Sequence, residues 1–191
     1  NVSTLFIIIS RKDTAKLEKN KINLDFITIC FTFAAEKSHY MSVKIQEVIT
    51  ALERFAPLPL QESYDNAGLQ IGLTGAEVSG VLLCLDVTEE VVREAVDLGC
   101  NMIVSHHPLL FRGLKMVSDA NYVQRCVRLA VQNDIAIYSA HTNLDNAEDG
   151  VNYKMAERLG LMDVELVSPR RVPVRIDGRE QTVRAGSGVV G

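Results

Sequence analysis

The chain has 191 residues, 47% of them hydrophobic and 23% charged, and its formal net charge is −4 at pH 7. This is the composition of an ordinary globular protein, long enough for one domain with a proper core. The chain has no net positive charge that would favour binding to nucleic acid or to an anionic membrane, so neither partner is expected. Four cysteines without a CxxC pair fit a reducing compartment and exclude a zinc ribbon.

Residues 1–40 differ in character from the rest. Two apolar runs, 5–9 and 26–35, lie on either side of a charged stretch, and each is far shorter than the roughly 20 residues that span a bilayer. In a signal peptide, basic residues precede the apolar run, and here no basic residue precedes the first apolar run. We therefore expect residues 1–40 to be a non-native or disordered leader that contributes little to the fold.

Four helices are expected in the remainder of the chain. Apolar residues from Ile45 to Phe55 recur at the spacing of one helical face, which predicts a helix over 43–56. Thr88 is a good N-cap for a second helix, which ends at Gly99. The same periodicity predicts helices at about 120–133 and at 150–159.

Between these helices lie apolar runs at 80–86, 102–105 and 135–140, which are typical of strands covered on both faces. A shorter strand is expected near 68–72. Alternating strands and helices predict an α/β domain with a mainly parallel sheet and helices packed on both faces. We assign residues 41–168 to this domain.

The segment 169–191 is expected to begin an antiparallel part. Short β-type runs at 174–176 and 181–183 flank Asp177-Gly178, a dipeptide that favours a tight hairpin turn. Five arginines are interleaved with apolar residues in this region; they are Arg170, Arg171, Arg175, Arg179 and Arg184. We interpret them as a solvated strand face rather than as a phosphate site.

The most informative residues are histidines at two expected strand ends. His106 and His107 follow the run at 102–105, while His141 and Asp145 follow the run at 135–140. Ligands of open α/β sheets gather at the carboxyl ends of the strands, and imidazole and carboxylate bind zinc, iron and manganese alike. Adjacent side chains of an extended chain point apart, so we expect His106 and His107 to bind one ion each of a pair, with Asp145 completing one coordination shell.

Plainer roles exist for each of these residues. The paired histidines also suit a strand cap, and His141 suits a supporting position beside the ions as well as direct binding. Asp65 and Asn66 are assigned to an Asx turn before Gly68, with a catalytic role as the alternative. Asp86 is as well suited to capping the following helix as to contacting an ion.

Taken together, the motifs strongly resemble the family of GTP cyclohydrolase 1 type 2 homologues, also called NIF-three-like proteins, over about 41–191. The segments that carry the resemblance are 64–72 (YDNAGLQIG), 85–88 (LDVT), 103–111 (IVSHHPLLF), 139–145 (SAHTNLD), 150–152 (GVN) and 188–191 (GVVG). It implies an α/β fold of two related halves, two divalent metal ions and a cytoplasmic, ring-shaped homo-hexamer. By motif, His106, His107 and Asp145 are the metal ligands and His141 lines the site. The family's C-terminal HxxxE motif has no counterpart, so the chain looks like the N-terminal half of such a protein.

The function expected first is that of a dinuclear metal-dependent hydrolase acting on a small molecule, GTP cyclohydrolase-like by resemblance only. No glycine-rich phosphate loop of either nucleotide-binding type is present. A non-catalytic metal-binding scaffold or interaction protein of the same family is the alternative. A plain α/β domain with incidental histidines is the third interpretation.

Overall fold

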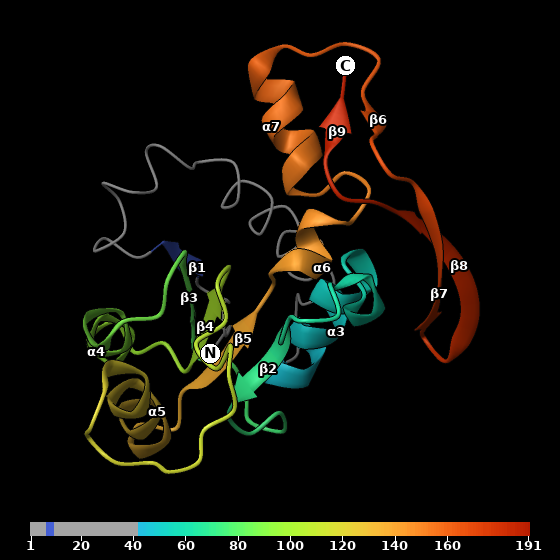
Figure 1. Ribbon diagram of the computed structural model, residues 1–191. Helices are drawn as coiled ribbons and strands as arrows, with labels where there is room; N and C mark the ends of the chain where they lie inside the picture. Colours follow the sequence, from blue (N-terminus) through green and yellow to red (C-terminus); the bar gives the residue numbers. More distant parts are fainter. Residues whose placement is uncertain (1–6, 10–41) are drawn as a thin grey trace.

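The computed structural model describes residues 7–9 and 42–191, and its centre is a five-stranded sheet of order β1-β3-β4-β5-β2 (Figure 1). Three neighbouring strand pairs are parallel, and β2 joins β5 in the antiparallel direction. This confirms the mainly parallel sheet. The strands are β1 (Ile7–Ile9), β2 (Gly68–Ile71), β3 (Val81–Cys84), β4 (Met102–Ser105) and β5 (Ala136–Ser139).

Helices cover both faces of this sheet, as predicted. Every residue of β3, β4 and β5 is buried, and successive side chains of a strand face opposite layers. Leu83 packs in the layer of α3 (Ile45–Phe55). Its neighbour Leu82 packs in the layer of α4 (Glu89–Asp97) and α5 (Tyr122–Gln132), which lie together in Figure 1.

The helices begin and end within one or two residues of the predicted positions. The Thr88 side chain accepts a hydrogen bond from the backbone N–H of Val91 and so caps α4. Asn121 caps α5 in the same way. At the other end of the domain, α7 (Val151–Leu159) closes at Gly160, whose φ of 74° is the left-handed conformation that favours glycine.

The C-terminal residues form the expected hairpin, and its strands are longer than the runs at 174–176 and 181–183 that predicted it. β7 (Arg170–Ile176) and β8 (Arg179–Ala185) pair along seven residues each. Asp177 and Gly178 both have positive φ, at 51° and 75°, as a tight two-residue hairpin turn requires. The hairpin packs Val174 into the same core as α3, so this segment rests on the α/β layers.

Two further strands lie beside α7, at the end of the molecule away from α4 and α5 (Figure 1). They are β6 (Glu165–Leu166) and β9 (Val189–Val190), and they pair in the antiparallel direction. In the segment that we expected to be a leader, Ile7–Ile9 pair with Val81–Leu83 as β1, and the rest of 1–40 lies outside the described residues. The described part of the chain contains no helix long and apolar enough to cross a membrane.

Candidate metal centre

The carboxyl ends of three parallel strands lie side by side. The register pairs Cys84 of β3 with Ser105 of β4, and Ser105 in turn with Ser139 of β5. Beyond the strand, the backbone N–H of His106 still donates to the carbonyl of Cys84 at 3.2 Å. The residues that follow each strand therefore emerge at one edge of the sheet, where the sequence places its histidines.

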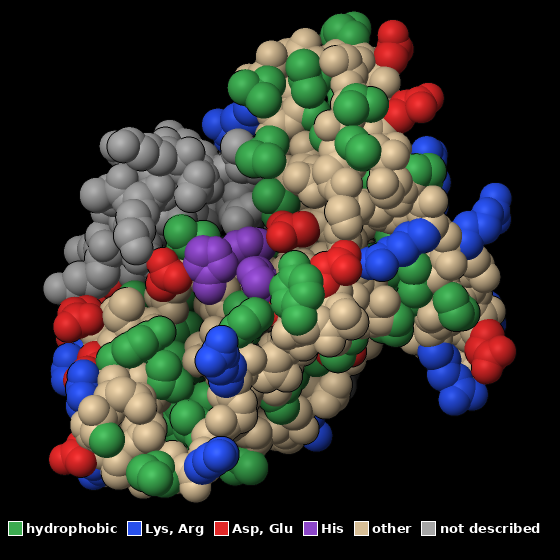
Figure 2. All heavy atoms as spheres, in the orientation of Figure 1, with side chains coloured by type: hydrophobic (Ala, Val, Ile, Leu, Met, Phe, Trp, Pro, Cys, Tyr) green, Lys and Arg blue, Asp and Glu red, His purple; other side chains and the backbone are tan. Residues whose placement is uncertain are grey.

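At this edge the structure brings three imidazoles together. His106, His107 and His141 each offer a ring nitrogen, and these three atoms lie within 4.8 Å of one another. The ring centroids are 4.9 Å apart for His106 and His107, 5.2 Å for His106 and His141, and 5.7 Å for His107 and His141. Figure 2 shows the histidine side chains as one surface patch with acidic side chains beside it. The cluster has the donor set and spacing of a divalent-cation site.

Each of the paired histidines has one ring nitrogen held by an oxygen. Nδ1 of His106 lies 2.9 Å from the carbonyl oxygen of Ala140, and Nδ1 of His107 lies 2.7 Å from Oδ1 of Asp86. A carbonyl or an ionised carboxylate only accepts, so Nδ1 donates in both rings. Nε2 of each neutral ring then carries the lone pair that a metal ion requires.

His106 is the most enclosed of the cluster, with 8% of the residue exposed. Burial disfavours its charged form and, with the nearby rings of His107 and His141, lowers the pKa of His106 to about 4. At neutral pH this imidazole is therefore uncharged without any metal present. A neutral ring is the form that binds a cation, so the folded protein keeps His106 in its cation-binding form.

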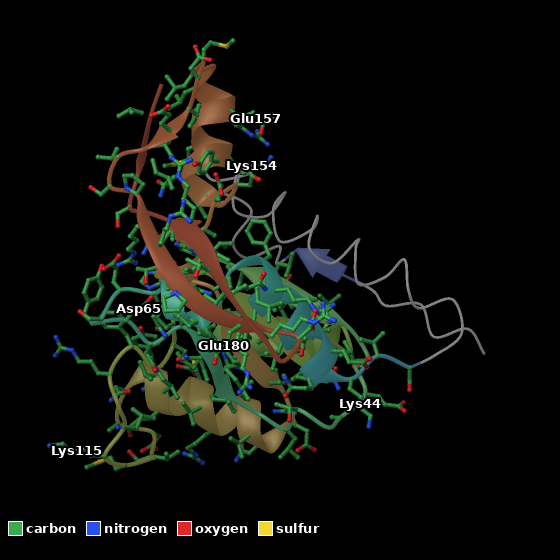
Figure 3. All side chains as sticks on the ribbon, turned by 90° about the vertical axis from the view of Figure 1, so that its right-hand side faces the viewer. Lys44, Asp65, Lys115, Lys154, Glu157 and Glu180 are labelled. Carbon is green, nitrogen blue, oxygen red and sulfur yellow. The ribbon has the colours of Figure 1, made fainter. Side chains whose placement is uncertain are left out.

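Asp65 holds the third histidine. Its Oδ1 lies 2.8 Å from Nδ1 of His141, and its Oδ2 accepts hydrogen bonds from both the backbone N–H and the hydroxyl of Thr142. The Asp65 side chain is fully covered, and Figure 3 places the residue in the body of the molecule, far from α7. Burial opposes its ionisation, but the hydrogen bonds from Thr142, His141 and Asn66 together lower the pKa of Asp65.

The sequence did not reveal this role of Asp65. The Asx turn expected at Asp65 is not formed: Oδ1 of Asp65 accepts from the backbone N–H of the adjacent Asn66, at 2.7 Å, whereas the N–H of Ala67, two residues on, donates to Gln61. The link to His141 joins residues 76 positions apart, which no local pattern predicts. The only available signal was the position of Asp65 inside the YDNAGLQIG motif. Asp86 likewise supports a histidine, in addition to preceding α4.

Asp145 lies at the end of α6 (Thr142–Asp145). Its Oδ1 is 3.9 Å from Nε2 of His106, so the carboxylate approaches the nitrogen that we expect to bind metal. Burial raises the pKa of Asp145, although His141 and His107 act in the opposite direction. A carboxylate in that state gains from a nearby cation. Its role as a ligand stays a prediction that this geometry permits.

Two buried asparagines fix α6 in place. The Asn143 side chain donates to the carbonyl of Ala56 at 2.7 Å, and the Asn146 side chain donates to the carbonyl of Leu60 at 2.9 Å. Both carbonyls belong to the segment that follows α3, where Leu58–Leu60 form a short 3₁₀ turn, η1. The helix that presents Asp145 is thus held from a distant part of the chain, which limits its movement relative to the histidines.

Comparison with known proteins assigns the chain to a family. The model of the Duf34/NIF3 family (NGG1p interacting factor 3) matches residues 43–191. The chain belongs to this family. The resemblance inferred from the motifs is thereby confirmed, and the histidine cluster lies within the matched region. Family membership and the cluster together support a metal-binding NIF3-like protein.

Curated relatives of this NIF3-family chain include two proteins named GTP cyclohydrolase 1 type 2 homolog. The protein from Clostridium acetobutylicum is 35% identical over 138 residues, which are 72% of this chain and 52% of that protein. The protein from Halalkalibacterium halodurans is 42% identical over 124 residues, 65% of this chain and 33% of that protein. The chain therefore spans about half or less of the length of these relatives.

Solved structures show the same fold. A Bacillus cereus protein related to NIF3 superposes with a TM-score of 0.66 and 42% identity, over 70% of this chain and 37% of that one. Reduced HcgD from Methanocaldococcus jannaschii superposes with a TM-score of 0.62 and 30% identity, over 71% of this chain and 56% of that one. The α/β fold predicted from the sequence is that of NIF3 proteins.

Proposed function

We propose that this NIF3-family protein is a dinuclear metal-dependent hydrolase in which His106, His107 and Asp145 hold two divalent ions. Zinc, iron and manganese all suit nitrogen and oxygen ligands. One observation carries the proposal. The Nδ1 atom of each of the three imidazoles is held by an oxygen acceptor. Proteins commonly orient metal-binding histidines in this way. The name of the curated relatives supports hydrolysis of a GTP-like substrate.

The residues of the cluster have separate tasks in this proposal. Two divalent ions held by His106, His107 and Asp145 would supply the chemistry of a two-metal site, which is activation of water at neutral pH and polarisation of the substrate. The His107 side chain is 46% exposed, which leaves the cluster accessible, as catalysis requires and as a closed structural site does not. His141, held at Nδ1 by Asp65, takes up the proton of the attacking water at Nε2.

An exposed aromatic ring, Phe111, lies beside the cluster. The centroid of Phe111 lies 6.4 Å from that of His141 in an edge-to-face arrangement, and Phe111 is 44% exposed. An exposed ring beside the reacting groups offers a stacking surface for a heterocyclic base. This supports a substrate with a flat ring system.

The experiment that tests the proposal measures ions and turnover on the same samples. Elemental analysis gives the number and identity of ions per chain, and hydrolysis is assayed across nucleotides and phosphoesters with each metal. His107→Ala is expected to lose ions and turnover together. His141→Ala is expected to keep the ions and lose turnover. His39→Ala, which changes a histidine outside all the motifs, is the matched control and is expected to resemble the unaltered chain.

Other results would contradict specific parts of the proposal. Bound ions without turnover of any substrate would leave a metal-binding scaffold, the non-catalytic alternative. Loss of ions in His141→Ala would make that residue a ligand rather than a proton acceptor. A chain without stoichiometric metal would overturn the proposal entirely.

The proposal includes a cytoplasmic homo-hexamer, which is supported by family membership alone. Light scattering coupled to size-exclusion chromatography tests the assembly, with six chains per particle expected. A monomeric mass at micromolar concentration would contradict it.

A further inference from the structure

The outer face of the β7–β8 hairpin carries a feature that the metal centre does not explain. An open pocket of about 390 Å³ is lined by Pro169, Arg170, Arg171, Thr182 and Arg184. Its volume falls within the range of small-molecule sites. Three of its five lining residues are arginines, so the pocket presents a concentration of positive charge in a chain whose net charge is negative.

The strand register brings two of these arginines face to face. Arg171 lies directly opposite Arg184 in the antiparallel pair, and Thr182 lies two residues further along on the same face. Like charges in directly opposed positions destabilise a strand pair. Further toward the turn, Arg175 instead faces Glu180, so the same face has an opposite-charge pair outside the pocket and a like-charge pair inside it.

The neighbouring carboxylates neutralise this charge only partly. Arg184 approaches Glu148 at 3.8 Å, and both side chains are about half exposed, so the pair is weak. Arg170 donates to the carbonyl of Leu60 at 2.9 Å and lies 3.3 Å from Glu62, which holds its guanidinium in place. The Arg171 side chain has no hydrogen bond or ion pair to any residue that the structure describes.

In place of the solvated strand face expected from the sequence, we propose that this pocket binds the phosphate group of a small phosphorylated molecule. Guanidinium groups present planar sets of N–H donors that match phosphate oxygens. An anion between Arg171 and Arg184 relieves their repulsion, and the Thr182 hydroxyl adds a neutral donor. The opposite face of the hairpin packs Val172 and Val174 on the core, so Arg171 and Arg184 stand on a strand pair that is fixed from behind.

The test is a calorimetric titration of the chain with inorganic phosphate and with pyrophosphate, at constant ionic strength maintained with chloride. Saturable binding is expected. Arg171→Gln and Arg184→Gln are each expected to weaken it about tenfold or more, as the loss of a charge-assisted hydrogen bond implies. Arg175→Gln, on the same strand and face but outside the pocket, is the matched control and is expected to change nothing.

A second measurement separates this site from the metal centre. Phosphate is expected to raise the melting temperature of the chain and of His107→Ala equally, and to raise that of Arg171→Gln by less at the same concentration. Binding lost in His107→Ala but kept in Arg171→Gln would move the phosphate to the metal centre and overturn the proposal. No saturable heat, or equal weakening in all three arginine variants, would also overturn it, because the latter is the behaviour of diffuse surface charge.

Discussion

His141 is held by a carboxylate from a distant part of the chain, since its Nδ1 lies 2.8 Å from Oδ1 of Asp65. The contact joins the end of β5 to the turn that precedes β2. The second oxygen of Asp65 binds Thr142, so one carboxylate orients the imidazole and the first residue of α6 together. This makes Asp65 a positioning residue for the cluster, and it leads to the first prediction.

Replacing Asp65 with asparagine is expected to weaken metal binding about 10- to 100-fold, because Asp65 also holds Thr142 at the start of α6, the helix that presents the proposed ligand Asp145. Asparagine keeps the shape, but its NH2 group cannot accept the two hydrogen bonds that Oδ2 of Asp65 takes from Thr142. Titration with zinc or manganese, followed by calorimetry, measures the change. Asp97→Asn, an exposed position at the end of α4, is the control, and equal affinity in both variants would show that Asp65 has no supporting role.

Replacing Asp86 with asparagine is expected to have a smaller effect than Asp65→Asn. The Asp86 and His107 side chains are 36% and 46% exposed, so water and salt screen their interaction, whereas the Asp65 side chain is fully covered. We expect a loss in ion affinity of less than about tenfold. The same titrations measure it at low and high salt. A loss larger than that of Asp65→Asn would contradict the importance of burial here.

The free energy of unfolding of the metal-free chain is expected to fall as the pH is lowered from neutral. Burial lowers the pKa of His106 to about 4 in the folded state, and the unfolded pKa is about 6.5. Between these two pKa values the unfolded chain binds more protons at His106 than the folded chain does. The contribution of His106 to the free energy of unfolding is therefore fully present above about pH 6.5 and is lost toward pH 4. The His106 contribution corresponds to about 2 kcal/mol between pH 7 and pH 5.

Urea denaturation in the presence of a chelator, near pH 7 and near pH 5, measures this change. The raised pKa of Asp145 acts in the opposite direction, because its protonation favours the folded state as the pH falls, so it reduces the net loss. His106→Gln, which cannot titrate, is the control and is expected to show a weaker pH dependence. The same slope in both proteins would mean that other groups are responsible.

Replacing Gly72 with alanine is expected to destabilise the fold by about 2 kcal/mol or more. The added Cβ would lie 2.5 Å from Cα of Ala136, and the φ of Gly72 is 116°. Because Ala136 begins β5, the strand that leads to His141, metal affinity is expected to fall as well. Gly113→Ala, where an added Cβ meets nothing within 4 Å, is the control for urea denaturation. Similar stability of the two variants would contradict the close packing between Gly72 and β5.

Much of the fold could be predicted because its signals are local. The buried runs at β3, β4 and β5 are continuous and apolar, and Thr88 and Gly160 mark helix ends through their own side-chain and backbone chemistry. The hairpin turn could likewise be predicted from the dipeptide Asp177-Gly178 alone. The extent of the hairpin could not be, since the mixed polar and apolar residues of β7 and β8 are stabilised as strands by pairing and by contact with the core.

The candidate site was predicted only in part. Strand ends of a parallel sheet share an edge, so His106, His107 and His141 were expected together, and the structure brings them together. The supporting contacts of Asp65 and Asp86 were not expected, nor was the arrangement of Arg171 against Arg184 as part of a pocket. Each of these depends on register and on loop paths that no spacing along the chain encodes.

The sequence by itself determined the alternation of strands and helices, the sheet edge that carries the histidines, and the turn of the final hairpin. These follow from hydrophobic period, capping chemistry and backbone preference, which act over a few neighbouring residues. Only the tertiary structure decided which oxygen holds each imidazole and which arginines share a pocket. A hydrogen bond across 76 positions has no local signal, because side-chain contacts at that separation depend on how the whole sheet is assembled.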